Sequence, residues 1–327
     1  MSPHWVSAKA GTPQLITRKT HMNLVRTLYR ALVPESVRDH VWFLRSFLRN
    51  IIHNRTSRRQ FLKDFYLSVG KHVSRVRING VFLYVDLRDY GVGLPLFLHR
   101  NYEPVETAFI RQSLQPGMVF VDVGANIGYY TTLAAQAVGP SGRVLAFEPD
   151  PYNFSLLELN VRKNGFTNVT LIKHALGAFP GEGILTRSPT NFGDHRLYES
   201  NERRTDTVRV PLDTLDSALA RYQLATVDVI KMDVQGYEQN VLAGMSNILR
   251  GNKALVVLTE FWPYGLEMAG GTGREFFESF LSYGFKPTLL YQDGTTSGVA
   301  WDEIQTKLPL FDPSHPDSSY LNLAFQK

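Results

Sequence analysis

One segment combines an acid with two glycines in a spacing that could bind a small-molecule ligand. In residues 121–131 (VDVGANIGYYT), Asp122 lies in an apolar run that leads to Gly124, Asn126 and Gly128. Gly124 would let a ligand approach the backbone, and Gly128 would let the following helix pack closely, with its first N–H groups facing the ligand. Asn126 interrupts the dinucleotide fingerprint G-x-G-x-x-G, and no Gly-Lys-Ser/Thr of a phosphate loop follows. The segment predicts a ligand-binding turn between a strand and a helix.

A second acid, Glu148, follows 26 residues after Asp122 in the sequence Phe-Glu-Pro-Asp. A carboxylate at the end of the second strand can accept both hydroxyls of a ribose, and each such hydrogen bond contributes about 1.5–3 kcal/mol. Glu148 could instead cap the next helix, but Asp150 is better placed for that. Asp122 could hold an ammonium group or order the turn. The two acids together suit a nucleoside with an amino-acid tail.

Four segments, in this order, resemble the FkbM family of S-adenosylmethionine-dependent methyltransferases. They are VDVGANIGYYT, AFEPDPYNFSLLELNVRKN, HALG (174–177) and VIKMDVQGYE (229–238), within a similarity that covers about residues 95–270. The resemblance implies S-adenosylmethionine as the cofactor and O-methylation of a sugar, glycoconjugate or natural-product hydroxyl. The cofactor-binding residues that it implies are Asp122, Gly124, Asn126 and Gly128 at the methionine portion, Glu148 at the ribose, and His174 and Ala175 near the adenine.

Methyl transfer to a hydroxyl needs a positioned acceptor and a base that takes its proton. The resemblance places Asp233 beside the transferring methyl, and we expect Asp233 and His195 to be catalytic. His195 lies in an irregular stretch that could cover the substrate, and histidine titrates in the useful range. Glu238 and Glu260 are the alternative bases.

Two neighbours of Asp233 bear on its role. Lys231 lies two positions earlier, so both side chains point to one face of the strand, where they could form an internal ion pair. The family usually has Glu where this chain has Gln235, which puts any chemistry of that carboxylate in question. Asp233, Glu238 and Glu260 could in principle hold Mg²⁺, but no compact ligand motif is present and we expect no metal.

The elements that position these residues alternate along the chain, which predicts an α/β fold with a mostly parallel sheet and helices on both faces. The resemblance implies the seven-stranded, Rossmann-like class I methyltransferase sheet with a final antiparallel strand. Strands are expected at 118–123, 143–148, 168–175, 227–234, 254–261, 285–291 and 320–326. Helices are expected at 103–114, 127–138, 152–164, 237–250 and 272–283. A hairpin is expected at 76–86, an irregular region at 177–210 and a short helix at 211–219.

The charge is divided unevenly between two parts of the 327-residue chain. Residues 1–77 hold 15 Lys and Arg against 3 Asp and Glu, whereas residues 78–327 hold 20 against 27. We expect 1–77 to be a basic, mostly helical extension and 78–327 to be the methyltransferase domain. The extension could pack on that domain or bind an anionic partner such as a membrane surface. Nucleic acid is not expected, because no named binding motif is present.

Composition narrows the remaining classes. The chain has no cysteine, which excludes disulfides, thiolate metal sites and a cysteine nucleophile. No apolar run is long enough for a membrane span, and the first residues do not resemble a signal peptide. We therefore expect a cytoplasmic protein, peripheral to a membrane if the extension binds one. Two other functions stay open: a non-catalytic nucleoside-binding module that docks through its extension, and an oxidoreductase, against which the interrupted glycine spacing argues.

Overall fold

The computed structural model describes residues 55–68, 70–198, 206–308 and 320–327. Backbone contacts divide the chain into two compact units, Met1–Asp64 and Phe65–Lys327. The helices expected in the first 54 residues lie outside the described part, and the extension is described from α3 (Arg55–Ser68) onward. Among the described helices, none combines the length and the apolar character that crossing a membrane requires.

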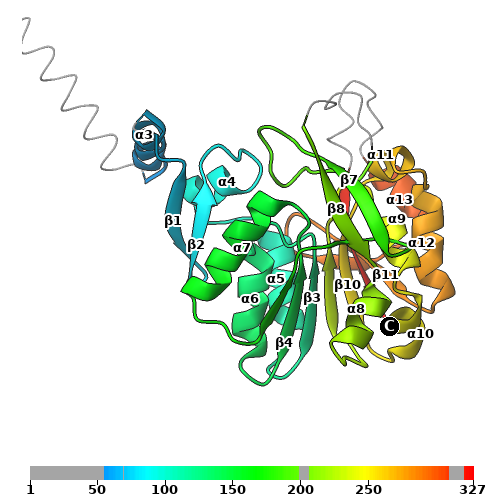
Figure 1. The fold of residues 1–327 in the computed structure, drawn as a ribbon. Helices are drawn as coiled ribbons and strands as arrows, with labels where there is room; N and C mark the ends of the chain where they lie inside the picture. The colour runs from blue at the N-terminus through cyan, green and yellow to red at the C-terminus, as the bar shows by residue number, and fades with distance from the viewer. Residues whose placement is uncertain (1–54, 69, 199–205, 309–319) are drawn as a thin grey trace, which may run out of the picture. The chain divides into compact units, whose positions relative to one another are not determined.

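An eight-stranded sheet forms the centre of the unit Phe65–Lys327 (Figure 1). The strand order is β12-β11-β13-β10-β9-β3-β4-β5. Their bounds are β3 (Val119–Val123), β4 (Arg143–Phe147), β5 (Val169–Ile172), β9 (Val229–Met232), β10 (Val256–Phe261), β11 (Lys286–Leu290), β12 (Thr296–Gly298) and β13 (Leu321–Gln326). The strands β10, β9, β3, β4 and β5 are parallel, and β13 is antiparallel to both β10 and β11. This confirms the expected class I architecture; the short β12 adds an eighth strand at one edge.

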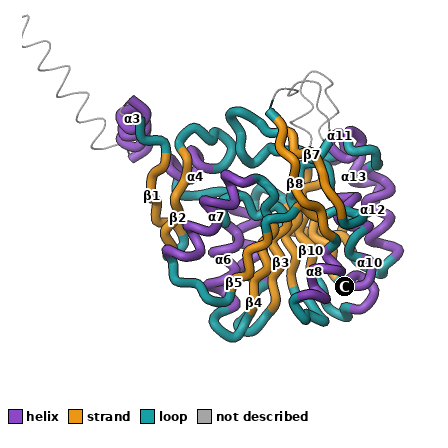
Figure 2. Tube along the Cα trace, viewed as in Figure 1, coloured by secondary structure: helices purple, strands orange, loops and turns teal. Residues whose placement is uncertain are grey.

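Helices cover both faces of the sheet, as the strand–helix alternation predicts (Figure 2). On one face lie α5 (Pro104–Ser113), α6 (Tyr129–Val138) and α7 (Pro151–Lys163). On the other lie α8 (Leu215–Arg221), α9 (Glu238–Ala243), α10 (Ser246–Gly251) and α12 (Gly273–Ser282). The remaining helices are α4 (Gly93–His99), α11 (Pro263–Met268) and α13 (Trp301–Lys307).

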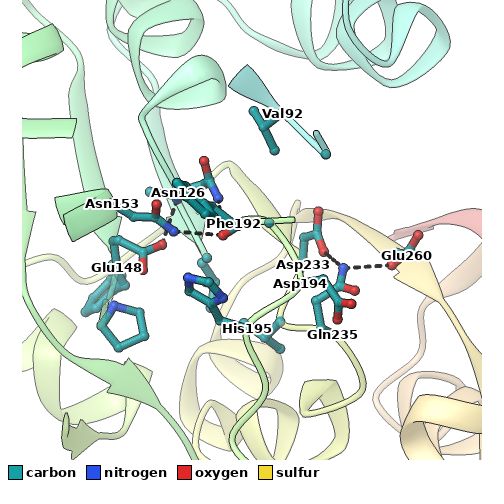
Figure 3. A pocket seen from close by; sticks show the side chains of 18 of the residues that line it. Val92, Asn126, Glu148, Asn153, Phe192, Asp194, His195, Asp233, Gln235 and Glu260 are labelled. Carbon is teal, nitrogen blue, oxygen red and sulfur yellow. Dashed lines mark hydrogen bonds between the residues drawn. The ribbon is translucent and has the colours of Figure 1, made fainter. Parts of the chain in front are cut away.

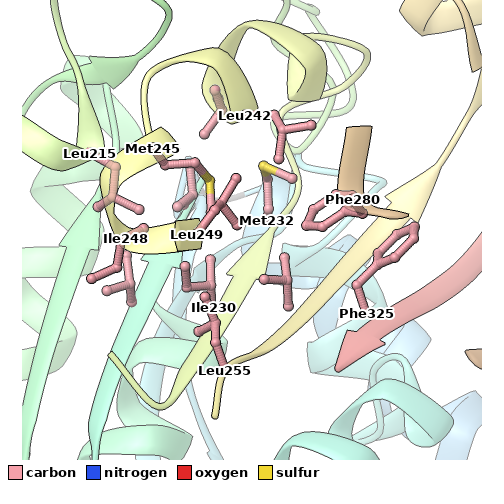
Figure 4. Packing of buried hydrophobic residues seen from close by; sticks show 14 of the residues in the cluster. Leu215, Ile230, Met232, Leu242, Met245, Ile248, Leu249, Leu255, Phe280 and Phe325 are labelled. Carbon is pink, nitrogen blue, oxygen red and sulfur yellow. The ribbon is translucent and has the colours of Figure 1, made fainter. Parts of the chain in front are cut away.

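The largest apolar core lies between the sheet and α8, α9, α10 and α12 (Figure 4). Val121 and Val123 of β3 point into it, and Ile230 and Met232 of β9 lie beside them. Successive side chains of a strand point to opposite faces, so Asp122, between the two valines, faces α6 instead. This alternation decides the environment of Asp122 before any ligand is considered.

Two smaller sheets are also present among the described residues of this unit. The strands β1 (Val73–Ile78) and β2 (Val81–Asp86) form the expected hairpin, in which Asn79 and Gly80 both have positive φ, 54° and 89°, as a type I′ turn requires. We expected a domain boundary between residues 77 and 78, but β1 pairs with β2 along its length. A boundary there would separate two hydrogen-bonded strands, whereas the contacts place it after Asp64.

The second small sheet lies where we expected irregular chain. It contains β6 (Ala175–Leu176), β7 (Gly181–Thr186) and β8 (Thr207–Asp213), with β7 and β8 antiparallel. The sequence of β7, GEGILT, has two glycines and no apolar alternation, so its pairing with β8 makes it a strand. The expected helix at 237–250 is divided into α9 and α10 around Gly244, where an added Cβ would lie 2.1 Å from the carbonyl oxygen of Gly177.

Candidate active site

A cavity of about 350 Å³ opens at the carboxyl ends of four neighbouring parallel strands. Its wall includes Gly124, which follows β3. It also includes Glu148 after β4, Asp233 after β9 and Glu260 of β10 (Figure 3). Open α/β sheets bind ligands at this edge, and the volume lies within the range of small-molecule sites. The structure therefore brings together the acids that the sequence indicated.

The glycine turn after β3 serves mainly to pack backbone segments together. Gly124 has a φ of 83°, and a Cβ there would lie 2.0 Å from the carbonyl oxygen of Asp233. Gly128 has a φ of 88°, and its Cβ would lie 2.6 Å from Leu157 of α7. Gly124 lines the cavity but Gly128 does not. The expectation that Gly128 contacts the cofactor is therefore not supported, because this glycine lets α6 pack against α7.

Asp122 also lies away from the cavity wall, contrary to the expectation that it lines the cofactor. It is buried on the α6 face, where its Oδ2 accepts a hydrogen bond of 2.6 Å from Thr131 Oγ1. Burial raises the pKa of Asp122 to about 6, although the Thr131 hydroxyl and the charge of Lys231 oppose the shift. Of the two roles considered for this acid, the geometry supports ordering the turn rather than holding an ammonium group.

Glu148 lies on the cavity wall with both carboxylate oxygens oriented by backbone groups. Oε2 accepts a hydrogen bond from the N–H of Asn126 and Oε1 accepts one from the N–H of Asp150, each 2.8 Å long. Burial raises the pKa of Glu148 to about 8; the two N–H groups oppose this shift, and the charges of Asp150 and Asp122 add to it. Asp150 is the N-cap of α7, as expected, so Glu148 is not needed as a cap.

The expected role of Asn126 changes, because its side chain holds a loop in place. Asn126 Nδ2 and Asn153 Nδ2 both donate to the carbonyl oxygen of Phe192, at 2.9 and 2.8 Å, while Asn126 Oδ1 accepts from the N–H of Ile127. The N–H of Phe192 donates to Asp89. The segment that contains Phe192 and His195 thus forms part of the cavity wall, and Asn126 lines the cavity while its amide is engaged with that segment.

His174 and Ala175 line the cavity next to Glu148, as the expected adenine position requires. Nδ1 of His174 is buried and has no hydrogen-bond partner within the described structure. A buried polar atom without a partner is costly, so this nitrogen suits a ligand that supplies the missing hydrogen bond.

A polar cluster occupies the opposite end of the cavity (Figure 3). Lys231 Nζ lies 2.6 Å from Asp233 Oδ2, and Gln235 Nε2 donates to both Asp233 Oδ1 (2.8 Å) and Glu260 Oε2 (3.2 Å). The ion pair considered for Lys231 and Asp233 is therefore present. Because Gln235 donates to two carboxylates, a glutamate at this position would place a third acid between them.

Asp233 and Glu260 differ in protonation because their partners differ. Burial acts to raise the pKa of Asp233, but the ammonium of Lys231 and the hydrogen bonds from Lys231 and Gln235 outweigh it, and the pKa is lowered. For Glu260, burial and then the charge of Asp233 raise the pKa well above its ordinary value. Asp233 is thus the carboxylate that stays ionised at neutral pH.

The other two base candidates are placed differently from the sequence-based expectation. His195 lines the cavity, but its Nδ1 accepts a hydrogen bond of 3.1 Å from the N–H of Ser188. The neutral ring then has its proton on Nε2, which makes His195 a hydrogen-bond donor rather than a base. Glu238 is buried outside the cavity wall and accepts a hydrogen bond from the N–H of Val234.

Several wall residues were not predicted from the sequence. Glu103 precedes α5 and accepts a hydrogen bond of 2.7 Å from Tyr130 OH. Arg196 pairs with Asp194 and lies over Trp262, with its guanidinium carbon 4.8 Å from the ring centroid. No local pattern marks Glu103 or Arg196, because each reaches the cavity only through the folding of loops far apart in sequence.

These observations fit S-adenosylmethionine. Glu148 has lone pairs left for ribose hydroxyls, since each oxygen accepts only one backbone N–H, and the partnerless His174 nitrogen lies nearby. The acidic wall suits a ligand with a cationic sulfur. Throughout the described ranges, no three His, Asp or Glu side chains converge as metal ligands would.

Comparison with known proteins identifies the family. The model of the methyltransferase FkbM domain matches residues 122–287, which is half of the chain. Methyltransferase 1 of Beauveria bassiana is 29% identical over 145 residues, covering 39% of this chain and 58% of that protein. Hexuronic acid methyltransferase AglP of Haloferax volcanii is 28% identical over 140 residues, covering 42% of this chain and 54% of that protein. The matches thus span little more than half the length of these relatives.

A solved structure of a family member, the FkbM methyltransferase of Methylobacillus flagellatus, is 17% identical with a TM-score of 0.42, covering 71% of this chain and 50% of that one. The family model spans the glycine turn, Glu148, the Asp233 cluster and Glu260 in one continuous match. This chain belongs to the FkbM methyltransferase domain family, whose cofactor is S-adenosylmethionine.

Proposed function

We propose that this protein transfers the methyl group of S-adenosylmethionine to a hydroxyl of a sugar, glycoconjugate or natural product. The observation that supports this most is the division of one cavity into two ends. Glu148 lies at one end, while Asp233 and Glu260 lie at the other (Figure 3). His174 follows the strand that pairs with Glu148, and Lys231 is hydrogen-bonded to Asp233. A site that only bound a nucleoside would not need a buried ion pair beyond the ribose end.

At the cofactor end, Glu148 accepts hydrogen bonds from the two ribose hydroxyls, and the buried Nδ1 of His174 faces the base. Hydrogen bonds to a carboxylate are the stronger kind, so Glu148 fixes the nucleoside along the wall. When bound, S-adenosylmethionine supplies an electrophilic methyl group on a positively charged sulfur. The turn at Gly124 keeps β3 against the Asp233 backbone and so sets the distance between the two ends.

At the acceptor end, Asp233 accepts a hydrogen bond from the acceptor hydroxyl and takes its proton as the new C–O bond forms. Lys231 keeps Asp233 ionised, and Gln235 fixes the orientation of its carboxylate through Oδ1. His195, which lines the same cavity, contacts the acceptor. Much of the rate enhancement then comes from positioning, and the base adds typically about 10²–10⁴-fold.

The name of one relative, a hexuronic acid methyltransferase, agrees with a sugar acceptor. The test is incubation of the purified protein with tritiated S-adenosylmethionine and an array of glycosides and hydroxylated natural products. We expect label on a hydroxyl oxygen. Label on a protein lysine or a nucleic-acid base would refute the acceptor class.

The second candidate, a nucleoside-binding module without activity, predicts binding without turnover. Calorimetry with S-adenosylhomocysteine, run beside the transfer assay, separates the two: binding with no labelled product on any acceptor would favour the module.

A further inference from the structure

On the described part of the cavity wall, both cations, Lys231 and Arg196, are paired with carboxylates. Lys231 lies 2.6 Å from Asp233, and its side chain is 8% exposed. Arg196 contacts Asp194 through Nε (2.7 Å) and through a terminal nitrogen (3.2 Å), and its side chain is 6% exposed. Buried pairs of this kind are costly to break, because separation leaves an uncompensated charge. Each cation therefore has its short ion pair with one acid, although the charge of Lys231 also acts on Glu103.

Three carboxylates on the same wall have no cationic partner among the described residues. Glu103 accepts a hydrogen bond from Tyr130, Glu260 accepts one from Gln235, and Glu148 accepts two from the backbone. Taken together, the described wall has five carboxylates and two cations. These three acids need hydrogen-bond donors or positive charge from whatever binds in the cavity.

The cofactor compensates only part of this excess. S-adenosylmethionine has a sulfonium, an ammonium and a carboxylate, so its net charge is +1. Its ribose hydroxyls would bind Glu148. Glu103 and Glu260 then remain to contact the acceptor. Hydroxyl groups can donate to both side chains, whereas an acceptor with its own negative charge would face the carboxylate of Glu103, which has no salt bridge among the described residues. Like charges brought together in a binding interface weaken the binding free energy by about 2 kcal/mol or more.

We propose that the acceptor is an uncharged polyol and that Glu103 excludes acceptors with a carboxylate or phosphate near the reacting hydroxyl. This rests on the proposed function and defines its substrate class. It separates this chain from the relative named for hexuronic acid. The discrimination arises from Glu103 as a repulsive element as well as from the attractive contacts of the acceptor hydroxyls. An amine in place of the carboxylate would be tolerated.

The test uses matched triplets of methyl hexosides that differ at one carbon: the neutral alcohol, the uronic acid and the amine. For each, kcat/KM is measured with tritiated S-adenosylmethionine at one pH and ionic strength. We expect the neutral sugar to exceed its uronic acid by about 100-fold, equivalent to about 2.7 kcal/mol, and the amine to be at least as good as the neutral sugar.

Glu103→Gln tests the cause, since the amide keeps an oxygen for Tyr130 while removing the charge. We expect this variant to raise kcat/KM for the uronic acid by about tenfold. The ratio of kcat/KM between the neutral sugar and its uronic acid would fall by the same factor. Glu158→Gln is the control, because Glu158 is an exposed acid on α7 outside the cavity. It should leave the ratio of kcat/KM between neutral sugar and uronic acid unchanged.

Different results would refute the selection for uncharged acceptors and the methyltransferase function itself. Equal or better methylation of the uronic acid, with the neutral sugar still methylated, overturns the charge selection and leaves the methyltransferase function intact. If Glu103→Gln leaves the ratio of kcat/KM between neutral sugar and uronic acid unchanged, Glu103 does not exclude charged acceptors. If no member of any triplet is labelled although S-adenosylhomocysteine binds, the proposed function fails and the substrate class with it.

Discussion

The protonation of Glu148 should make cofactor binding depend on pH. Its pKa is about 8 in the ligand-free protein, because burial disfavours the charged form, yet the ribose hydroxyls are bound best by the ionised carboxylate. With a pKa of about 8, about one molecule in eleven is ionised at pH 7, and the apparent affinity falls by that fraction. Affinity for S-adenosylhomocysteine should therefore rise about tenfold per pH unit up to pH 8 and then level off.

The expected magnitude can be measured by titration calorimetry between pH 6 and pH 9. Across this range the affinity should change by about 100-fold, or about 2.7 kcal/mol. Binding at pH 7 should release close to one proton, which appears as a dependence of the measured heat on the ionisation enthalpy of the buffer. Glu148→Gln cannot ionise, and its amide nitrogen would face the N–H of Asn126 or Asp150. It should bind about 10- to 100-fold more weakly than the wild type at pH 9, with no pH dependence.

A matched control distinguishes Glu148 from the nearby Asp122, whose pKa is raised to about 6. Asp122→Asn keeps an oxygen for the Thr131 hydroxyl and should retain the full pH dependence. If the wild type binds equally well at pH 6 and pH 9, or if Glu148→Gln shows the same slope, Glu148 does not bind the ribose as an ionised carboxylate and the reasoning is refuted.

Three further predictions follow from the described contacts and from the charge distribution. Asp233→Asn should lower kcat by about 10²–10⁴ while S-adenosylhomocysteine still binds; unchanged turnover in a methyl-transfer assay would remove Asp233 as the base. Gly265→Ala would place a Cβ 2.1 Å from the ring of buried Trp262 and should cost about 1–3 kcal/mol in denaturant unfolding. Gly251→Ala, where an added Cβ meets nothing within 4 Å, is the control and should not destabilise; equal effects would contradict the steric explanation. Residues 1–54 hold eight Lys and Arg against two Asp and Glu, so removing them, with β1 left intact, should abolish a salt-sensitive binding to phosphatidylserine vesicles. If the truncated protein still sediments with the vesicles, another part of the chain binds the membrane.

The strands and helices between residues 103 and 164 could be predicted almost to the residue. Apolar runs such as VFVDV and stops such as the glycines at 139 and 142 act locally, so they determine elements without reference to the rest of the chain. The position of Asp150 as a helix cap follows from the same local chemistry. The strand β7 could not be predicted, because its residues become a strand only by pairing with β8.

The candidate site divides in the same way. From the sequence alone, the order of strands places Gly124, Glu148, Asp233 and Glu260 at one edge, since parallel strands in such a sheet end on the same side. Only the tertiary structure decided how each side chain is used. The alternation of β3 turned Asp122 toward α6, two amides met on the carbonyl of Phe192, and loops distant in sequence brought Glu103 and Arg196 into the wall. Hydrogen bonds and ion pairs between distant segments depend on the packing of the whole unit, and no local pattern in the chain encodes them.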